Sequence, residues 1–107
     1  GTSMPYARIN MAEFKSVEEK NRRVGILKKN LKGVFPDIRA FASIETSATS
    51  QLTISIYDDQ DAADQAAAQF ETYRDEDALA DLFTHEGSVN HFFIEADQVD
   101  ALLKSGS

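Results

Sequence analysis

The chain contains no cysteine and no tryptophan. Without cysteine it has no disulfide bond, no thiolate nucleophile and no cysteine-ligated metal site. It also has no apolar run of about 18 residues that would span a membrane, and no charged segment followed by an apolar one as in a secretory signal. We therefore expect a cytoplasmic protein that does not act on a membrane.

Basic residues are in the minority and are unevenly distributed. The formal net charge is -7, yet residues 1–57 hold nine Lys and Arg against five Asp and Glu, whereas residues 58–107 hold two against thirteen. An acidic total argues against nucleic acid as the main partner, because clustered Lys and Arg drive that binding by counterion release. We interpret the basic cluster at 20–32 as a solvated helix face, with a patch for an anionic partner as the alternative.

The length of 107 residues and the hydrophobic fraction of 42% are those of one globular domain. We expect this domain to cover residues 4–104. Residues 1–3 precede a methionine and are interpreted as a tag remnant.

The periodicity of apolar residues predicts four strands and two main helices. Strands are expected at 6–14, 38–45, 51–58 and 88–95, where apolar and polar residues alternate. A capping box at Ser16 begins a helix that ends near Gly33, and Asp59 or Asp61 caps a second helix. Residues 78–83 are expected to form a further helical piece, and residues 96–104 a weak amphipathic turn or two.

The element order β, α, β, β, α, β predicts an α+β protein with the ferredoxin-like arrangement, a four-stranded antiparallel sheet with both helices on one face. We expect Ile9 and Ile54 to lie under the helices. The other face then carries aromatic side chains, at Tyr6, Phe14, Phe41, Tyr57 and either Phe92 or Phe93. Because soluble monomers seldom expose so large an apolar patch, we expect a homodimer formed through this open sheet face.

Five segments together carry a resemblance to known proteins: YARINMAEF, the helix SVEEKNRRVGILKKNLKGVF, the hairpin SIETS/QLTISIYDD, the helix AADQAAAQFETYR and the closing HEGSVNHFFIE. In these segments the chain resembles the dimeric α+β barrel superfamily, and within it the antibiotic biosynthesis monooxygenase-like proteins. The resemblance implies a dimeric barrel with a pocket in each subunit between sheet and helices. Characterised members include oxygenases that use no metal or flavin and act on polycyclic aromatic substrates, and haem-degrading enzymes. Both groups commonly place a tryptophan in the pocket, which this chain lacks.

The two histidines do not have the spacing of a zinc motif. His85 and His91 are six positions apart, whereas HExxH needs four on one helix, and Gly87 would interrupt a helix between them. We interpret His85 as the end of a helix, stabilised by the helix dipole. His91 is placed in the last strand between Val89 and Phe93, either as a core histidine or as a polar group that points into a pocket.

The functional alternative makes His91 the catalytic residue, which takes a proton from a phenolic substrate whose carbanion then reacts with dioxygen. Arg8, Asn10, Tyr57 and Tyr73 are the candidate ligand-binding residues, with Arg8 holding the anion. Asp59 and its acidic neighbours lack the glycine and glutamate of an EF-hand loop, so we expect helix capping rather than calcium binding. No metal and no other cofactor is expected.

Two classes of function therefore remain open. The first is a homodimer that binds a small organic molecule and acts as a cofactor-independent monooxygenase on an aromatic or phenolic compound. The second is a ligand-binding or scaffold dimer without catalysis. An RNA-recognition domain is set aside because the strand QLTISIYDD lacks the aromatic pattern that stacks on bases.

Overall fold

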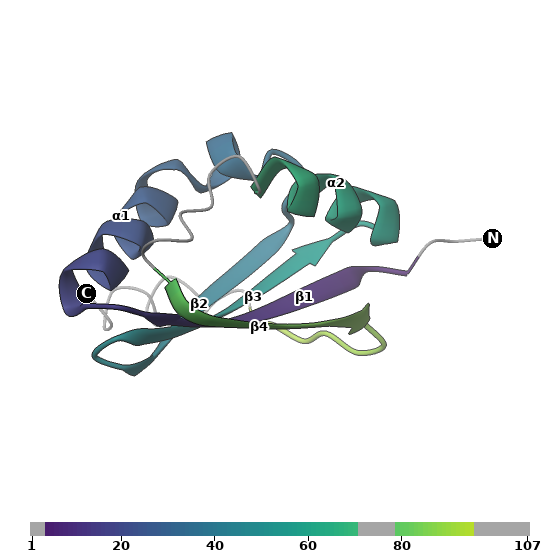
Figure 1. The fold of residues 1–107 in the computed structure, drawn as a ribbon. Coiled ribbons are helices and arrows are strands. Elements are labelled where there is room, and N and C mark those ends of the chain that lie inside the picture. Colours follow the sequence, from purple (N-terminus) through teal and green to yellow (C-terminus); the bar gives the residue numbers. More distant parts are fainter. Residues whose placement is uncertain (1–3, 71–78, 96–107) are drawn as a thin grey trace.

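The structure is a computed structural model that describes residues 4–70 and 79–95. Two helices cover one face of a four-stranded antiparallel sheet (Figure 1). The elements follow one another as β1 (Tyr6–Phe14), α1 (Val17–Val34), β2 (Ala40–Ser47), β3 (Ser50–Tyr57), α2 (Gln60–Phe70) and β4 (Leu79–Ser88). Across the sheet the order is β2-β3-β1-β4, which confirms the predicted ferredoxin-like topology. Within the described ranges, neither helix is long and apolar enough to cross a membrane.

Both helices begin at the predicted caps. The Ser16 hydroxyl accepts a hydrogen bond from the Glu19 amide at 3.1 Å, while the Glu19 carboxylate pairs with Arg22 one turn further on. At the start of α2 the Asp59 carboxylate accepts a hydrogen bond from the Ala62 amide at 2.8 Å. These caps satisfy amides that have no partner within the helix, and so fix where each helix begins.

The last strand lies earlier in the chain than the sequence predicted. β4 pairs with β1 from Tyr6 opposite Ser88 to Phe14 opposite Leu79. The expected helix at 78–83 and the expected strand at 88–95 are therefore wrong for the described residues. Pairing with the free edge of β1 outweighs the helical propensity of Ala, Leu and Asp in ALADLF, as tertiary context commonly does.

The two faces of the sheet are also exchanged relative to the prediction. Phe14, Phe41 and Tyr57 line the space beneath the helices, whereas Ile9 and Ile54 face the other way. In β3 the row that meets the helices is Gln51, Thr53, Ser55 and Tyr57, so the more polar row is the covered one and alternation alone assigns the faces the wrong way round. Large rings fill the gap between a sheet and a helix layer, and the aliphatic residues are left on the open face.

The core lies at one end of the space between sheet and helices. Its buried members come from the end of α1, the following loop, β3 and α2: Val34, Phe35, Ile38, Tyr57, Ala63 and Ala66. The alanines let α2 approach the sheet closely at this end. Toward α1 and β4 the two layers are less tightly filled, and this is where the pocket lies.

Candidate functional site

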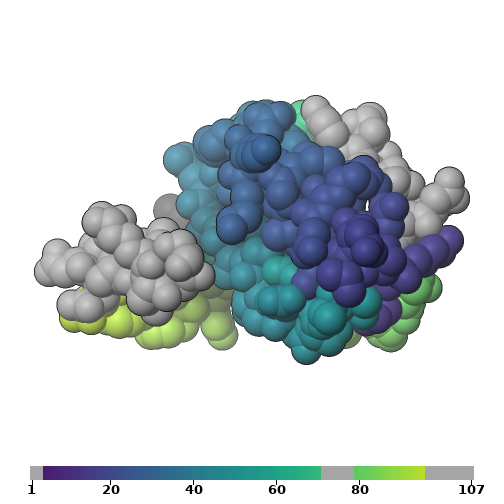
Figure 2. Space-filling model, turned by 90° about the vertical axis from the view of Figure 1, so that its left-hand side faces the viewer, coloured from purple at the N-terminus to yellow at the C-terminus, as the bar shows by residue number. Residues whose placement is uncertain are grey.

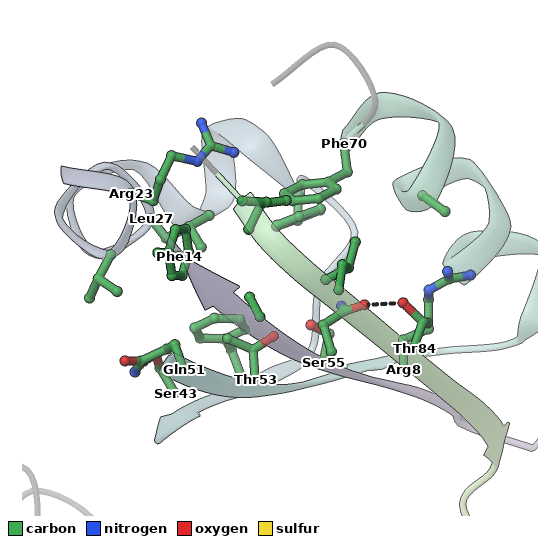
Figure 3. Close-up of a pocket in the computed structure, with 18 of the residues that line it drawn as sticks. Arg8, Phe14, Arg23, Leu27, Ser43, Gln51, Thr53, Ser55, Phe70 and Thr84 are labelled. Carbon is green, nitrogen blue, oxygen red and sulfur yellow. Dashed lines mark hydrogen bonds between the residues drawn. The ribbon is translucent and has the colours of Figure 1, made fainter. Parts of the chain in front are cut away.

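A cavity of about 150 Å³ lies between the sheet and the two helices (Figure 3). All four strands contribute to its floor, while Arg23 and Leu27 of α1 and Phe70 of α2 reach it from above. Apolar and aromatic side chains make up most of its wall, and polar side chains from the strands stand on its floor. This combination of apolar walls and a few fixed polar groups is typical of small-molecule sites.

One end of the floor carries a cation. Arg8 and Asn10 stand on the same face of β1, and the Thr84 hydroxyl of β4 donates to Asn10 Oδ1 at 2.8 Å (Figure 3). Arg8 Nη1 lies 3.1 Å from Oε2 of Glu86, the residue of β4 that pairs with Arg8. The other Glu86 oxygen accepts a hydrogen bond from the Tyr6 hydroxyl at 2.9 Å, and this bond raises the pKa of Tyr6.

The other end of the floor is polar but uncharged. Gln51 is buried, and its amide nitrogen donates to the Ser43 hydroxyl of β2 at 2.6 Å. Thr53 stands beside this pair in Figure 3, two residues along β3 from Gln51. Buried polar groups require hydrogen-bond partners, so these side chains are held in fixed positions that a ligand can recognise.

Tyr57 and the phenylalanines form the aromatic part of the lining. Tyr57 is only 2% exposed, and burial raises the pKa of its hydroxyl by more than the neighbouring Ser55 side chain lowers it. Tyr57 therefore keeps its proton at neutral pH. Phe35 and Phe70 stack with their ring centroids 5.7 Å apart.

The predicted site residues are only partly brought together. Arg8, Asn10 and Tyr57 line the pocket, whereas Tyr73 lies outside the described residues. His91 follows the end of β4, so its predicted place inside a strand is wrong. Its side chain is exposed and does not line the pocket. Figure 2 shows the segment that follows β4, coloured yellow-green, extending beyond the other coloured parts of the molecule.

His85 and Gly87 are corrected in the same way. His85 is not a helix end but a member of β4, opposite Ile9, where its ring stacks on that of Phe83. Gly87 is not a turn but pairs with Ala7 within the strand. Both lie in exposed positions on the edge strand.

Several lining residues were missed by the sequence reasoning. They are polar residues of the strands: Ser43, Gln51, Thr53, Ser55 and Thr84. The alternation in QLTISIY already places three of them on one face with Tyr57. Had that polar row, rather than the aliphatic one, been assigned to the helix-facing side, the floor of the pocket would have been identified.

The titratable groups of the described lining are Arg8, Arg23 and Tyr57. Two are cations and the third is a neutral hydroxyl, so together they can bind an anion and donate a hydrogen bond to a ligand oxygen. Within residues 4–70 and 79–95, no group of three or more His, Asp or Glu side chains is placed to hold a metal ion.

Comparison with known proteins finds similarity in structure and not in sequence. No protein family model and no curated protein matches the chain. A dimeric ferredoxin-like protein from an uncultured marine organism superposes with a TM-score of 0.66 at 9% identity, covering 87% of this chain and 94% of the other. A variant of SnoaB, a cofactor-independent oxygenase from Streptomyces nogalater, gives a TM-score of 0.65 at 11% identity, covering 87% and 100%.

A candidate antibiotic biosynthesis monooxygenase from Nitrosomonas europaea gives a TM-score of 0.69 at 14% identity, covering 85% of this chain and 95% of the other. At such low identity the similarity concerns the arrangement of the chain and not its chemistry. The coverage is high on both sides, so the described elements correspond to nearly the whole of each similar structure. The chain therefore has the ferredoxin-like fold found in dimeric ferredoxin-like and antibiotic biosynthesis monooxygenase proteins.

Proposed function

We propose that the protein is a homodimer that binds a small organic molecule in the pocket beneath its helices. The observation that carries this proposal is the composition of the pocket, an apolar cavity of about 150 Å³ on whose floor the buried Gln51 and Ser55 stand. A cavity of similar size, when lined only by apolar groups, takes up benzene. Here the fixed polar groups add a means of recognising ligand oxygens.

The dimer is supported by the open face of the sheet. Apolar side chains on this face are substantially exposed: Ile9 37%, Met11 38%, Ile44 46% and Phe83 61%. These residues come from β1, β2 and β4, so they extend across the sheet. Packing this face on a second copy removes the apolar surface from water and joins two sheets into a barrel. A similar structure is that of a dimeric ferredoxin-like protein, which supports a dimer here.

Sedimentation tests the dimer directly. One chain has a mass of 11.8 kDa, so we expect twice that mass at micromolar concentration. A mass that stays at the single-chain value up to high concentration would overturn the dimer and leave the pocket proposal standing.

Cofactor-independent oxygenation of an aromatic or phenolic compound is the catalytic part of the proposal. It is supported by the fold shared with SnoaB and by an aromatic pocket with an arginine at one end. His91 is the proposed proton acceptor. Because His91 does not line the pocket of its own copy, this role requires His91 to approach the pocket of the partner.

A binding protein without catalysis is the alternative, and one observation favours it. The titratable groups of the described lining are two arginines, whose side chains carry donors and no acceptor, and Tyr57, whose hydroxyl pKa is raised by burial. They are therefore suited to hold a ligand rather than to take a proton from it.

Two measurements distinguish these functions. A library of phenols together with haem is screened by thermal shift, and we expect a phenol to raise the unfolding midpoint because it binds only the native state. Oxygen consumption is then followed with each compound that binds. Uptake that is lost in His91→Ala supports the oxygenase, uptake that His91→Ala leaves unchanged removes the role of His91, and binding without uptake supports the non-catalytic alternative.

A further inference from the structure

We propose that the pocket selects an anionic ligand of about one aromatic ring, and that Glu86 sets the strength of this selection by competing with the ligand for Arg8. The inference rests on the proposed function, since it assigns a ligand class to the same pocket. Its basis is the cationic end of the floor, where an arginine, an amide and a carboxylate meet at adjacent positions of β1 and β4.

Arg8 has donors left for a ligand. Glu86 Oε2 lies 3.1 Å from one terminal nitrogen, Nη1, whereas a guanidinium carries five N–H groups. The Arg8 side chain is 21% exposed, so most of it lies within the fold, and it lines the pocket. A carboxylate matches the planar fork of a guanidinium better than a single oxygen does, because two parallel hydrogen bonds form.

Asn10 adds a second donor at the same end. Its Oδ1 accepts the Thr84 hydroxyl at 2.8 Å, so its amide nitrogen is the part left to donate. Asn10 stands two residues from Arg8 on the same face of β1, and both line the cavity. An anion at this end therefore meets a positive charge and a neutral donor side by side.

Glu86 lies outside the pocket lining but contacts the residue that anchors the ligand. Its side chain is 37% exposed, and the Tyr6 hydroxyl donates to its second oxygen at 2.9 Å. Tyr6 thus holds the carboxylate beside Arg8. A negative charge this close weakens the attraction of Arg8 for any anion that enters the pocket.

The size of the cavity limits the ligand. About 150 Å³ is the volume of a cavity that takes up benzene. Phe14, Phe35, Phe41 and Phe70 supply the surrounding rings. A single ring between these side chains, with its carboxylate directed to Arg8, uses both the apolar wall and the cationic end.

The test uses benzoate, its neutral analogue benzamide, and acetate as an anion without a ring. The purified full chain carries isotope-labelled methyl groups, and NMR titration follows Leu27 and Leu82 in the pocket beside Ile9 and Ile44 on the open face. We expect benzoate to shift the leucine signals and not the isoleucine signals, with an affinity at least about tenfold above those of benzamide and acetate. The preference for benzoate over benzamide should fall as salt screens the charge of Arg8.

Variants then test whether Arg8 and Glu86 determine the preference for the anion. Arg8→Gln should remove most of the preference for benzoate over benzamide, with Arg23 left as the other cation of the described lining. Glu86→Gln should strengthen benzoate binding by about threefold to fivefold, the range expected for a partly exposed ion pair, and leave benzamide binding unchanged. Glu13→Gln is the matched control, because it removes the same charge from β1 at an exposed position beside Thr49.

Each unfavourable result has a distinct meaning. If benzoate and benzamide shift the leucine signals with equal affinity in the wild-type protein, the anion selectivity is overturned while the pocket remains a binding site. If Glu86→Gln weakens benzoate binding, Glu86 orients Arg8 and does not compete with the ligand, and the proposed role of Glu86 is wrong. If no probe shifts the leucine signals at millimolar concentration, both the inference and the pocket as a ligand site fail.

Discussion

Phe35, in the loop after α1, and Phe70, at the end of α2, stack with ring centroids 5.7 Å apart and an interplanar angle of 23°. Phe35 is 7% exposed and belongs to the buried core, while both rings also line the pocket. The pair is therefore where the two helical segments, the core and the cavity meet. Offset stacking of this kind adds a specific attraction to the burial of the rings.

Replacing Phe35 with alanine should lower the free energy of unfolding by about 3 kcal/mol or more, because a large buried side chain is lost and a cavity remains. The measurement is urea unfolding followed by far-ultraviolet circular dichroism. Ile26→Ala is the control, since Ile26 lies on α1 with 39% of its surface exposed. A loss in Phe35→Ala no larger than in Ile26→Ala would show that Phe35 does not hold the helical segments together.

The second prediction concerns the stability contributed by the buried ion pair of Lys20 with Glu45. Lys20 is 4% exposed, and its nitrogen contacts the Glu45 carboxylate and lies 3.5 Å from the Ser47 carbonyl oxygen. Glu45→Gln leaves a buried charge without its counterion and should destabilise the fold by about 1 kcal/mol, a value reduced because Glu45 is largely exposed. Lys20→Met should cost less, because it removes the charge together with the need for a partner. Equal losses in thermal or urea unfolding would contradict this account.

Tyr57 should make the fold sensitive to alkaline pH. Burial raises the pKa of its hydroxyl above that of an unfolded tyrosine. The stabilisation is therefore complete below the ordinary tyrosine pKa of about 10 and is lost as pH rises through the higher pKa of the folded state. We expect the free energy of unfolding to fall above about pH 10, and to fall less steeply in Tyr57→Phe. Tyr6→Phe, which removes a surface hydroxyl, should retain the Tyr57-dependent part of the loss.

A single charge placed on the open sheet face should disrupt the proposed dimer. Ile9 lies in β1, one of the two central strands, and is 37% exposed in one copy. Ile9→Lys should shift the sedimentation mass from twice 11.8 kDa to that of one chain, because burying an unpaired ammonium in an apolar interface is costly. Gln65→Lys adds the same charge on an exposed position of α2 and should leave the dimer intact. A dimer that survives Ile9→Lys would place the interface elsewhere.

The sequence predicted the type and order of most elements because their local signals were strong. Ser16 and Asp59 cap the helices as expected, and the strand at 6–14 coincides with β1. The last strand was misplaced because local propensity in ALADLF favours a helix, while the pairing that makes it β4 comes from residues more than sixty positions earlier. No local pattern contains that information.

The site was only partly predictable, for a related reason. Arg8, Asn10 and Tyr57 were identified as lining residues although the sheet faces had been assigned the wrong way round. β1 and β3 each carry an aliphatic row and a row that mixes polar with aromatic residues. The strand period of two separates these rows, but it does not say that the helices cover the mixed one. His91 was selected as the one histidine in a predicted strand, and with β4 ending at Ser88 that reason no longer holds.

On β1 the residues of the pocket and of the open face alternate, so Ile9 stands between Arg8 and Asn10 on a single stretch of backbone. A peptide unit cannot shift on one side of a sheet without shifting on the other. Any displacement of this strand on association would move the guanidinium and the amide with it, so we expect ligand occupancy and subunit association to be thermodynamically linked. Saturating the pocket with ligand should then change the dissociation constant of the dimer, and dimerisation should change the dissociation constant of the ligand by the same factor.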